Sequence, residues 1–490
     1  MTSTLDVLST PEWVCRLRPQ WPHELSKVRQ LYLSLYEAIT HGELVDGQVL
    51  PSSRLLSQLL SVGRNTVIAV YTQLQDERLI MTDGRRGTQV THCVPVADKA
   101  SYAGDSDVCG VLSKRSASCV ALSRSNSALA PGVPDASLFP VDAWRKAMMA
   151  ATRLPAEHLG YSESALPQLQ IAIARFLAIY RSLSVDPQQI IVTSSTRQSL
   201  ALAAIMYANH DDYAWVETPG YPGAVDAFRM MGLTLSPISV DTNGADLNLS
   251  AKRKTPAIIY LTPCFQYPTG VALAPDRRRQ ILEYAEKHNA VIFEDDYDSE
   301  FRDVSQARPA LASTRRREGS IVLHAGTFSK LIFPAVRIAW LVVPKSHVAR
   351  SQQCLKALGG GSNTLAQAAV AEILNNGSLA KHLQRARHIY TQRRHALLEA
   401  LEEIELLHPP RDTGGSLSLV VNLKKPLSAE RLSIQLKKQQ LGVQFVEELM
   451  WDEPTANKVQ GLVLGLGNVS TLQIPETVRA LERALQNARK

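Results

Sequence analysis

The chain has 490 residues, of which 45% are hydrophobic and 20% are charged, and this balance excludes a chain that is disordered throughout. No apolar run is long enough to cross a bilayer, and the net charge of +7 permits a nucleic-acid partner without requiring one. Six cysteines form no C-x-x-C pair and no cluster with histidine, which argues against a structural zinc and a disulfide scaffold. We expect a reduced, cytoplasmic protein of about two to four domains that binds neither metal nor membrane.

Residues 24–92 are predicted to form a small domain of helix, helix, turn, helix and hairpin. Apolar residues at helical spacing predict a first helix that ends near His41 and Gly42. Ser52 is a good N-cap for a short second helix, and a third begins at Arg64. Asp83 and Gly84 favour a hairpin. The buried stripe of the third helix is predicted to consist of Val67, Val70, Tyr71 and Leu74.

Residues 93–127 are predicted to be a flexible linker. Eight of the 27 residues from 101 to 127 are serine, and few are bulky and apolar. A third folded domain is the alternative, but the composition fits a linker better.

Residues 1–95 contain one Lys and eight Arg against nine acidic residues, so their net charge is zero. A DNA-binding role for this part therefore depends on where its arginines lie.

The remaining residues, 128–490, are predicted to form an α/β domain with a smaller mixed α/β part at the end. Six short apolar segments alternate with helical stretches, which favours a sheet covered by helices on both faces. Long helices are expected over 348–358 and 364–403. The six predicted strands lie at 190–192, 214–216, 257–261, 290–293, 321–323 and 338–343.

The clearest chemical signal is the segment Gly-Thr-Phe-Ser-Lys at 326–330. Lys330 follows an apolar strand and has hydroxyl groups beside it and few acids. A lysine in such surroundings can lose its proton and form a Schiff base with an aldehyde, while Thr327 and Arg337 could hold a phosphate. A surface lysine after a strand is the alternative, and this segment alone does not decide between the two.

Four further polar turns follow predicted strands. Acidic residues at 294–300 surround Tyr297 directly after a strand, where ligands bind in doubly wound sheets. A carboxylate there could keep a pyridine nitrogen protonated, although acids that cap a helix would give the same pattern. The turns at 262–270, 217–223 and 193–198 offer an aromatic ring and a helix start suited to a phosphate. Each turn is weak evidence alone, whereas five in this order point to one shared site.

With these motifs in place, residues 128–490 resemble the fold-type I aminotransferases, which use pyridoxal 5′-phosphate (PLP). With the helical block in front, the whole chain resembles the MocR subfamily of the GntR family of bacterial transcription regulators. The resemblance implies a multidomain protein. Its N-terminal winged helix-turn-helix, mainly α, would be joined to an α/β PLP-dependent transferase domain of fold type I with a small C-terminal α/β subdomain. The matching stretches are 42–44 with 50–54, 64–67, 266–270, 294–301 and 326–330.

The resemblance also implies roles for individual residues. Lys330 would form the Schiff base with PLP, and Asp295, with Asp296 as the alternative, would pair with its pyridine nitrogen. Tyr297 would bind the ring hydroxyl, and Tyr221 would stack on the ring. The remaining implied residues are Thr196, Thr327 and Arg337 for the phosphate, and Tyr161 for a reach across a homodimer.

Several positions depart from the family's pattern. Ser195 and Gln170 stand where Gly and Arg are usual, and Phe265 stands where His is common. Residues 462–466 read Leu-Val-Leu-Gly-Leu, where many relatives have Leu-Arg-Leu-Gly-Phe. Because that arginine binds a substrate carboxylate in the aminotransferases, Val463 speaks against ordinary amino-acid transamination. A different arginine, such as Arg197, could still serve.

In the helix-turn-helix, the third helix would lie in the major groove of double-stranded DNA. Arg64 could read a guanine and Asn65 an adenine. The alternative is a small helical domain with solvated arginines, but here the arginines lie at helix starts and at the hairpin tip. A block without net charge is expected to need a dimer that reads two half-sites. Further contacts would come from Thr66 and Arg54 to phosphates, and from Arg85 and Arg86 to the minor groove or the backbone.

Three hypotheses follow for the function. The favoured one is a PLP-responsive, DNA-binding transcription regulator, whose aminotransferase-like domain forms the dimer and senses an amine, an amino acid or PLP itself. The second is an active PLP-dependent aminotransferase with an accessory DNA-binding domain. The third is a regulator whose PLP site has decayed into a dimerisation core, and the presence of Lys330, Asp295 and Tyr297 weighs against it.

Overall fold

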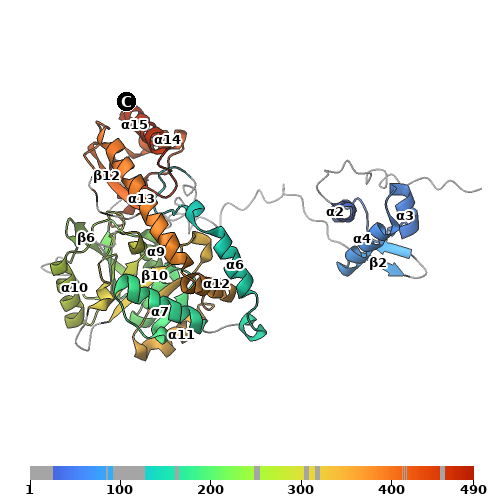
Figure 1. Ribbon diagram of the computed structural model, residues 1–490, viewed down its shortest axis with the longest axis horizontal. Helices are drawn as coiled ribbons and strands as arrows, with labels where there is room; N and C mark the ends of the chain where they lie inside the picture. The colour runs from blue at the N-terminus through green and yellow to red at the C-terminus, as the bar shows by residue number, and fades with distance from the viewer. Residues whose placement is uncertain are drawn as a thin grey trace, which may run out of the picture. The chain divides into compact units, whose positions relative to one another are not determined.

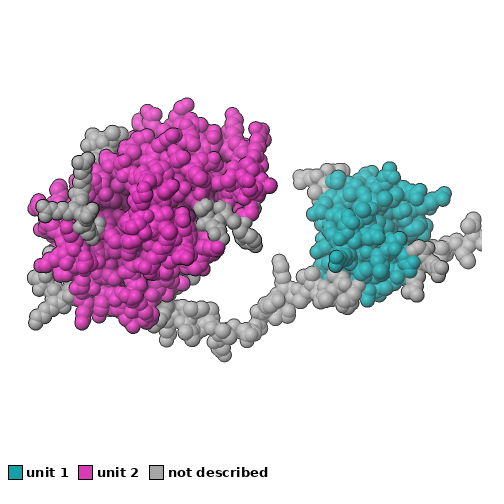
Figure 2. Space-filling view, turned by 90° about the horizontal axis from the view of Figure 1, so that it is seen from below, with its two compact units in different colours: residues 1–114 teal, residues 115–490 magenta. Residues whose placement is uncertain are grey.

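The computed structural model describes residues 26–83, 87–91, 127–160, 165–247, 254–302, 308–314, 321–410, 412, 414, 417–452 and 458–489. The chain divides into two compact units, residues 1–114 and 115–490 (Figures 1 and 2). The predicted linker, except for its last residue, lies outside the described residues. Within the described ranges, no helix is long and apolar enough to cross a membrane.

The described part of the first unit contains three helices and a small antiparallel sheet of order β1-β3-β2. The predicted helices and hairpin are confirmed. The strand β1 was not predicted, because two residues are too few to show an alternating pattern. The elements are α2 (Lys27–Thr40), β1 (Val49–Leu50), α3 (Ser53–Leu60), α4 (Arg64–Asp76), β2 (Ile80–Asp83) and β3 (Gly87–Val90).

Local sequence explains how α3 and α4 are placed. The Ser52 hydroxyl accepts a hydrogen bond from the Leu55 backbone N–H at 3.2 Å, as expected of an N-cap. The helix ends at Ser61, whose φ of 54° turns the chain toward α4. All four residues of the predicted stripe of α4 are buried, in a core that includes Leu31 and Leu56. The opposite face of α4 is therefore left to solvent.

An eight-stranded sheet lies at the centre of the second unit, in the order β4-β11-β10-β9-β8-β5-β6-β7. Strands β10, β9, β8, β5 and β6 are parallel, whereas β11 and β7 run antiparallel to their neighbours. All six predicted strands are present, and β6 and β7 were missed. The bounds are β4 (Ile190–Thr193), β5 (Tyr213–Thr218), β6 (Thr234–Asp241), β7 (Gly244–Asp246), β8 (Pro256–Leu261), β9 (Val291–Asp296), β10 (Val322–Thr327) and β11 (Ala339–Val342).

Helices cover both faces of this sheet (Figure 1). The face that carries Phe293 packs against α8, α9 and α11, and the face that carries Ile292 packs against α10 and, further along the sheet, α7 and α12. Neighbouring residues of one strand therefore point into different layers. The bounds are α6 (Val141–Ala151), α7 (Pro167–Arg181), α8 (Thr196–Tyr207), α9 (Pro222–Met230), α10 (Pro275–His288), α11 (Val348–Ala357) and α12 (Thr364–Asn375).

A small subdomain follows at the C-terminal end, with an antiparallel sheet of order β12-β14-β13. The single helix predicted over 364–403 is wrong. Asn376 and Gly377 form a turn between two helices, and Gly377 has a φ of +75°, which glycine adopts without strain. The elements are α13 (Ser378–Glu402), β12 (Ser418–Ser428), α14 (Ala429–Lys438), β13 (Gln444–Phe445), β14 (Lys458–Gly465) and α15 (Ile474–Arg489).

The segment 127–135, which begins at the last residue of the predicted linker, is held by this subdomain. Leu129 lies in the subdomain's core, and its carbonyl accepts a hydrogen bond from the Gly465 N–H at 2.7 Å. Asp135 pairs with Arg393 of α13 at 2.5 Å. The segment is thus tied to β14 and to α13.

Candidate functional site

The five turns singled out in the sequence lie at one edge of the large sheet. Strands β5, β8, β9 and β10 are parallel, and β4 points the same way because both β4 and β10 are antiparallel to β11. Each turn begins at or close to the carboxyl end of one of these strands, and the acidic segment 294–300 starts within β9. In such sheets this edge is where ligands bind.

Lys330 lies in the turn after β10, and its ammonium group donates a hydrogen bond to the carbonyl oxygen of Gly132. Burial lowers the pKa of Lys330, and the nearby carboxylates Asp298 and Asp295 only partly oppose this shift. A lysine with a lowered pKa holds a larger fraction of neutral amine, which is the form that attacks an aldehyde.

Asp295 and Asp296 are neighbours at the end of β9, but they point to opposite faces of the sheet. Asp295 accepts a hydrogen bond from the Tyr260 hydroxyl at 2.8 Å through Oδ2, while its buried Oδ1 has no hydrogen-bond partner among the described residues. Burial raises the pKa of Asp295 to about 7. This carboxyl group therefore has one oxygen held in place and one oxygen available to a ligand.

Asp296 is already engaged by other side chains of the protein. Its carboxylate forms an ion pair with the buried Arg181 of α7, and His324 Nε2 lies 3.4 Å away. Burial opposes ionisation, but Arg181 and His324 together hold the pKa of Asp296 below its ordinary value. The Ser299 hydroxyl donates to the same group.

The residues expected at a phosphate lie on or beside neighbouring strands. Thr327 and Thr193 both pair with Ala339 of β11, so the ends of β10 and β4 lie about 10 Å apart. Thr196 opens α8 three residues after Thr193. Ser195, the residue that replaces the usual glycine, is the N-cap, and its hydroxyl accepts from the Gln198 N–H at 3.3 Å. Arg337 is exposed and has a φ of +52°.

Three tyrosines form an aromatic wall beside these groups. The Tyr267 ring lies 6.2 Å from Tyr221 and 6.1 Å from Tyr297, in an edge-on arrangement with each. Burial raises the pKa of Tyr221, while Arg197, which hydrogen-bonds to it, acts in the opposite direction. The Tyr267 hydroxyl donates to Gln444 Oε1 at 3.1 Å and so links the wall to the small subdomain.

Comparison with known proteins accounts for both units. Residues 27–90 match the model of the gntR family of bacterial regulatory proteins, and residues 129–447 match aminotransferase class I and II. The chain is 30% identical to the "Probable rhizopine catabolism regulatory protein MocR" of Rhizobium meliloti, over 93% of each chain. The chain is a MocR-type regulator of the gntR family. It is also 32% identical to the pyridoxine biosynthesis regulator PdxR of Corynebacterium glutamicum, over 83% of this chain and 85% of that protein.

The aminotransferase part of this MocR-type regulator has the fold of solved PLP enzymes. The α-aminoadipate aminotransferase LysN of Thermus thermophilus, solved with N-(5′-phosphopyridoxyl)-L-leucine, is 26% identical. Its TM-score is 0.68, with 76% of this chain and 96% of that chain covered. The predicted fold class, a winged helix-turn-helix followed by a fold-type I transferase domain with a small C-terminal subdomain, is confirmed.

The small subdomain contacts the Tyr267 hydroxyl through an uncharged residue, Gln444. Leu462 and Leu464 of β14 belong to the subdomain core, and Val463 between them is buried on the opposite face. Val463 pairs with Gln444, the residue that receives the Tyr267 hydroxyl. In this MocR-type regulator neither the valine nor the amide carries a positive charge that could pair with a carboxylate.

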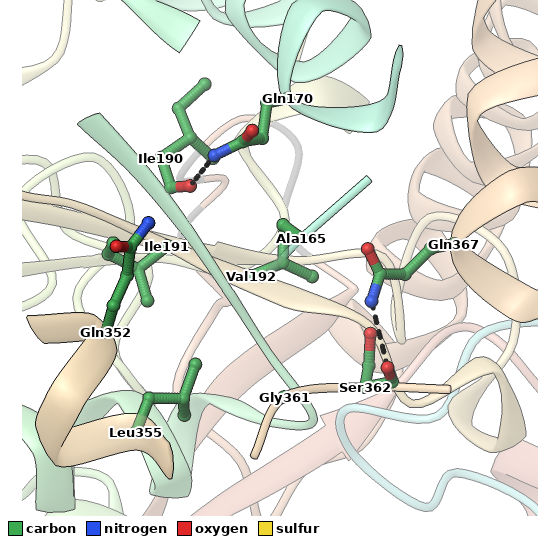
Figure 3. Close-up of a pocket in the computed structure, with 10 residues that line it drawn as sticks. All are labelled: Ala165, Gln170, Ile190, Ile191, Val192, Gln352, Leu355, Gly361, Ser362 and Gln367. Atoms are coloured by element: carbon green, nitrogen blue, oxygen red, sulfur yellow. Dashed lines mark hydrogen bonds between the residues drawn. The ribbon is translucent and has the colours of Figure 1, made fainter. Parts of the chain in front are cut away.

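Two other residues that depart from the family's pattern, Gln170 and Phe265, take part in packing. Gln170 donates a hydrogen bond to the Ile190 carbonyl at 2.8 Å. It also lines a pocket of about 20 Å³ beside β4, together with Gln367 and Ser362 (Figure 3). This volume holds about one water molecule. Phe265 is buried, and the Arg302 guanidinium lies 4.3 Å from its ring centre.

The predicted DNA-binding residues lie on the surface of the first unit. Arg64 and Asn65 are exposed in the first turn of α4, Thr66 is partly exposed, and Arg54 is exposed near the start of α3. The Gly63 N-cap offers no side-chain hydrogen bond, and no acid lies in the first turn of α4. Arg85, Arg86 and Tyr161 lie outside the described residues.

Sequence reasoning missed three residues of the site. Tyr260 could have been found, because it lies on the strand beside β9 and faces the same layer as Phe293 and Asp295. Gly132 and Gln444 carry no local signal, since they reach the site only through tertiary packing. Within the described ranges, no group of three or more His, Cys, Asp or Glu side chains is arranged to hold a metal ion.

Proposed function

We propose that this regulator binds PLP and double-stranded DNA as a homodimer, and that PLP, or its adduct with an amine or amino acid, alters its DNA affinity. The observation that carries the proposal is that two groups lie at the ends of neighbouring strands: Lys330, whose pKa burial lowers, and Asp295, whose buried Oδ1 has no hydrogen-bond partner among the described residues. PLP supplies an aldehyde that takes up an amine and a protonated pyridine ring that withdraws electrons.

The residues around this pair fit PLP. A protonated pyridine nitrogen would satisfy Asp295 Oδ1 and would favour the ionised carboxylate, while Tyr260 holds the other oxygen. In this proposal Lys330 binds the aldehyde carbon, Tyr297 the ring hydroxyl, and Tyr221 the ring face. Asp296 is the poorer partner for the pyridine, because it already neutralises Arg181. The phosphate is assigned to Thr196, Thr327 and Arg337, with the N-terminus of α8 nearby.

The contact between Lys330 and Gly132 offers a route from PLP to DNA binding. Gly132 belongs to the segment 127–135, which begins at the last residue of the predicted linker. When Lys330 is joined to PLP, its nitrogen can no longer donate to Gly132 as an ammonium group. Loading the site therefore changes how the start of the second unit is held, and this start is covalently connected to the DNA-binding unit.

On the DNA side, Arg64 and Asn65 are assigned to base edges in the major groove, and Arg54 and Thr66 to phosphates. The exposure of these residues at the starts of α3 and α4 supports the assignment. The net charge of residues 1–95 is zero, so one copy gains little from general attraction to phosphates. Two copies reading two half-sites supply the remaining affinity, which is the reason for proposing a homodimer.

The test is a DNA-binding titration with the region upstream of the protein's own gene. Wild type, Arg64→Ala, Lys330→Ala and the exposed control Lys345→Ala are compared at one salt concentration, with and without PLP. We expect Arg64→Ala to lose specific binding and Lys330→Ala to bind DNA without responding to PLP. A wild-type DNA affinity that PLP leaves unchanged, in a protein whose absorbance shows bound PLP, would contradict the proposed coupling.

A further inference from the structure

The solvent face of α4 contains a large apolar residue between the residues assigned to bases. Ile68 is 42% exposed, and it lies one turn beyond Arg64. At about 100° per residue, Arg64, Ile68, Thr72, Asn65 and Ala69 occupy, in that order, an arc of about 140°. The buried stripe from Val67 to Leu74 lies on the other side of the helix. Ile68 is thus inside the exposed face and not at its border.

The fold of the first unit does not use this side chain. Ile68 is not among the apolar residues that form its core or pack against it. A single exposed apolar side chain is common on protein surfaces and has no meaning by itself. The position of Ile68, beside Arg64 and Asn65 on the helix that enters the groove, gives it a defined chemical neighbour.

We infer that Ile68 reads a thymine through the C5-methyl group of the base. This inference rests on the proposed DNA-binding function. In the major groove, the thymine methyl is the apolar feature that distinguishes one base pair from the others. Four residues advance about 6 Å along the helix, and successive base pairs lie about 3.4 Å apart. The thymine therefore lies within about two base pairs of the base that Arg64 contacts.

The experiment first selects tightly bound duplexes from a randomised DNA library with the full-length protein at fixed salt. Each thymine of the selected half-site is then replaced singly by deoxyuridine, which pairs identically but lacks the methyl group. For wild type, we expect one replacement per half-site to weaken binding about fourfold, the effect of removing one buried methyl. For Ile68→Ala, binding of the thymine duplex falls to the deoxyuridine level, and the difference between the two duplexes disappears.

Two control variants accompany this measurement. Ile68→Val keeps a branched apolar group and should retain part of the discrimination. Val45→Ala shortens a side chain that is 59% exposed and lies outside α3 and α4, and this variant should retain all of the discrimination. Thermal unfolding should be unchanged in all three variants, because none of the altered side chains is in the core.

The outcomes separate this inference from the function on which it rests. If selection yields no preferred sequence, the proposed DNA-binding function is wrong, and the inference falls with it. If a sequence is selected but no thymine methyl matters, or if Ile68→Ala loses as much affinity with deoxyuridine as wild type does, the regulator binds DNA and the inference about Ile68 alone is wrong.

Discussion

At the scale of single residues, two adjacent carboxyl groups are predicted to behave in opposite ways when each is neutralised. We expect Asp296→Asn to lower the free energy of unfolding by about 3–5 kcal/mol, because the buried Arg181 loses its counter-charge. At pH 4, where the Asp295 carboxyl group is protonated in the folded protein, we expect Asp295→Asn to change the stability much less, because an amide oxygen can still accept from Tyr260. The same variant should weaken PLP binding about tenfold to a hundredfold, the value of a charge-assisted hydrogen bond.

Urea unfolding followed by tryptophan fluorescence measures the first effect, and an absorbance titration with PLP measures the second. The two variants differ by one position and by the same chemical change, so each is the control for the other. If Asp296→Asn lost PLP while Asp295→Asn kept it, Asp296 would be the partner of the pyridine nitrogen.

The raised pKa of Asp295 also predicts a pH dependence in protein freed of PLP. Folded protein keeps the proton of Asp295 up to about pH 7, whereas the unfolded chain releases it near pH 4. The contribution of Asp295 to stability is therefore present below pH 4 and is lost as the pH rises toward 7. The difference of three pKa units means that about 4 kcal/mol of the free energy of unfolding is lost over this pH range.

The measurement compares the free energy of unfolding of wild type and Asp295→Asn from pH 4 to 8. Glu217, whose pKa burial raises to about 7 as well, is present in both proteins, so only the part of its shift that Asp295 causes remains in the difference. A difference between the two proteins that does not change over this pH range would show that Asp295 is ionised in the folded state at every pH.

At the scale of elements, the strands and turns that have a clear local pattern of apolar and polar residues were predicted from the sequence. Strand β9 is buried on both faces and opens with a continuous apolar run before its three acidic residues, whereas β6 mixes apolar and polar residues, contains Pro237 and was missed. The turns after β9 and β10 were found because polar residues follow apolar runs. Gly132 and Gln444 lie 198 and 177 residues from their partners Lys330 and Tyr267, so no local pattern could pair them.

The uncharged residues Val463 of β14 and Gln444 of β13 lead to a prediction about the binding of α-amino acids. We expect wild type to show little spectral response to α-amino acids when PLP is bound, because Val463 and Gln444 cannot neutralise a carboxylate. Val463→Arg should raise the apparent affinity for an α-amino acid at least about tenfold, the value of one charge-assisted hydrogen bond.

Val463→Met adds bulk without charge, and it should leave the response to amino acids unchanged. The absorbance of the PLP-loaded proteins during titration with an amino acid and with its decarboxylated amine is the measurement. Steady transamination by wild type would contradict the prediction, and it would point to another arginine, such as Arg197 beside Tyr221, as the carboxylate partner.

At the scale of the whole molecule, the two units have separate cores and are joined in sequence by residues 92–126. An effector that binds at Lys330 can influence DNA binding only through that connection or through direct contact between units. The segment 127–135 lies where the first of these routes enters the second unit, bound at Gly132, Leu129 and Asp135. Coupling between two sites requires that each ligand favour a different arrangement of the protein.

Cutting the connection tests which route operates. A recognition site for a specific protease, inserted within residues 101–121, leaves both units intact until the protease is added. Before cleavage we expect PLP to change the DNA affinity about 5-fold to 150-fold, the usual range of such coupling. After cleavage we expect the second unit to keep its PLP absorbance and the first unit to bind DNA more weakly, because it is no longer held as a dimer. The effect of PLP on DNA affinity should then vanish.

The same insertion in Lys330→Ala should show no PLP effect before or after the cut. If PLP still changed the DNA affinity of the cleaved protein, the signal would pass through direct contact between the two units, and Gly132 would not be part of its path.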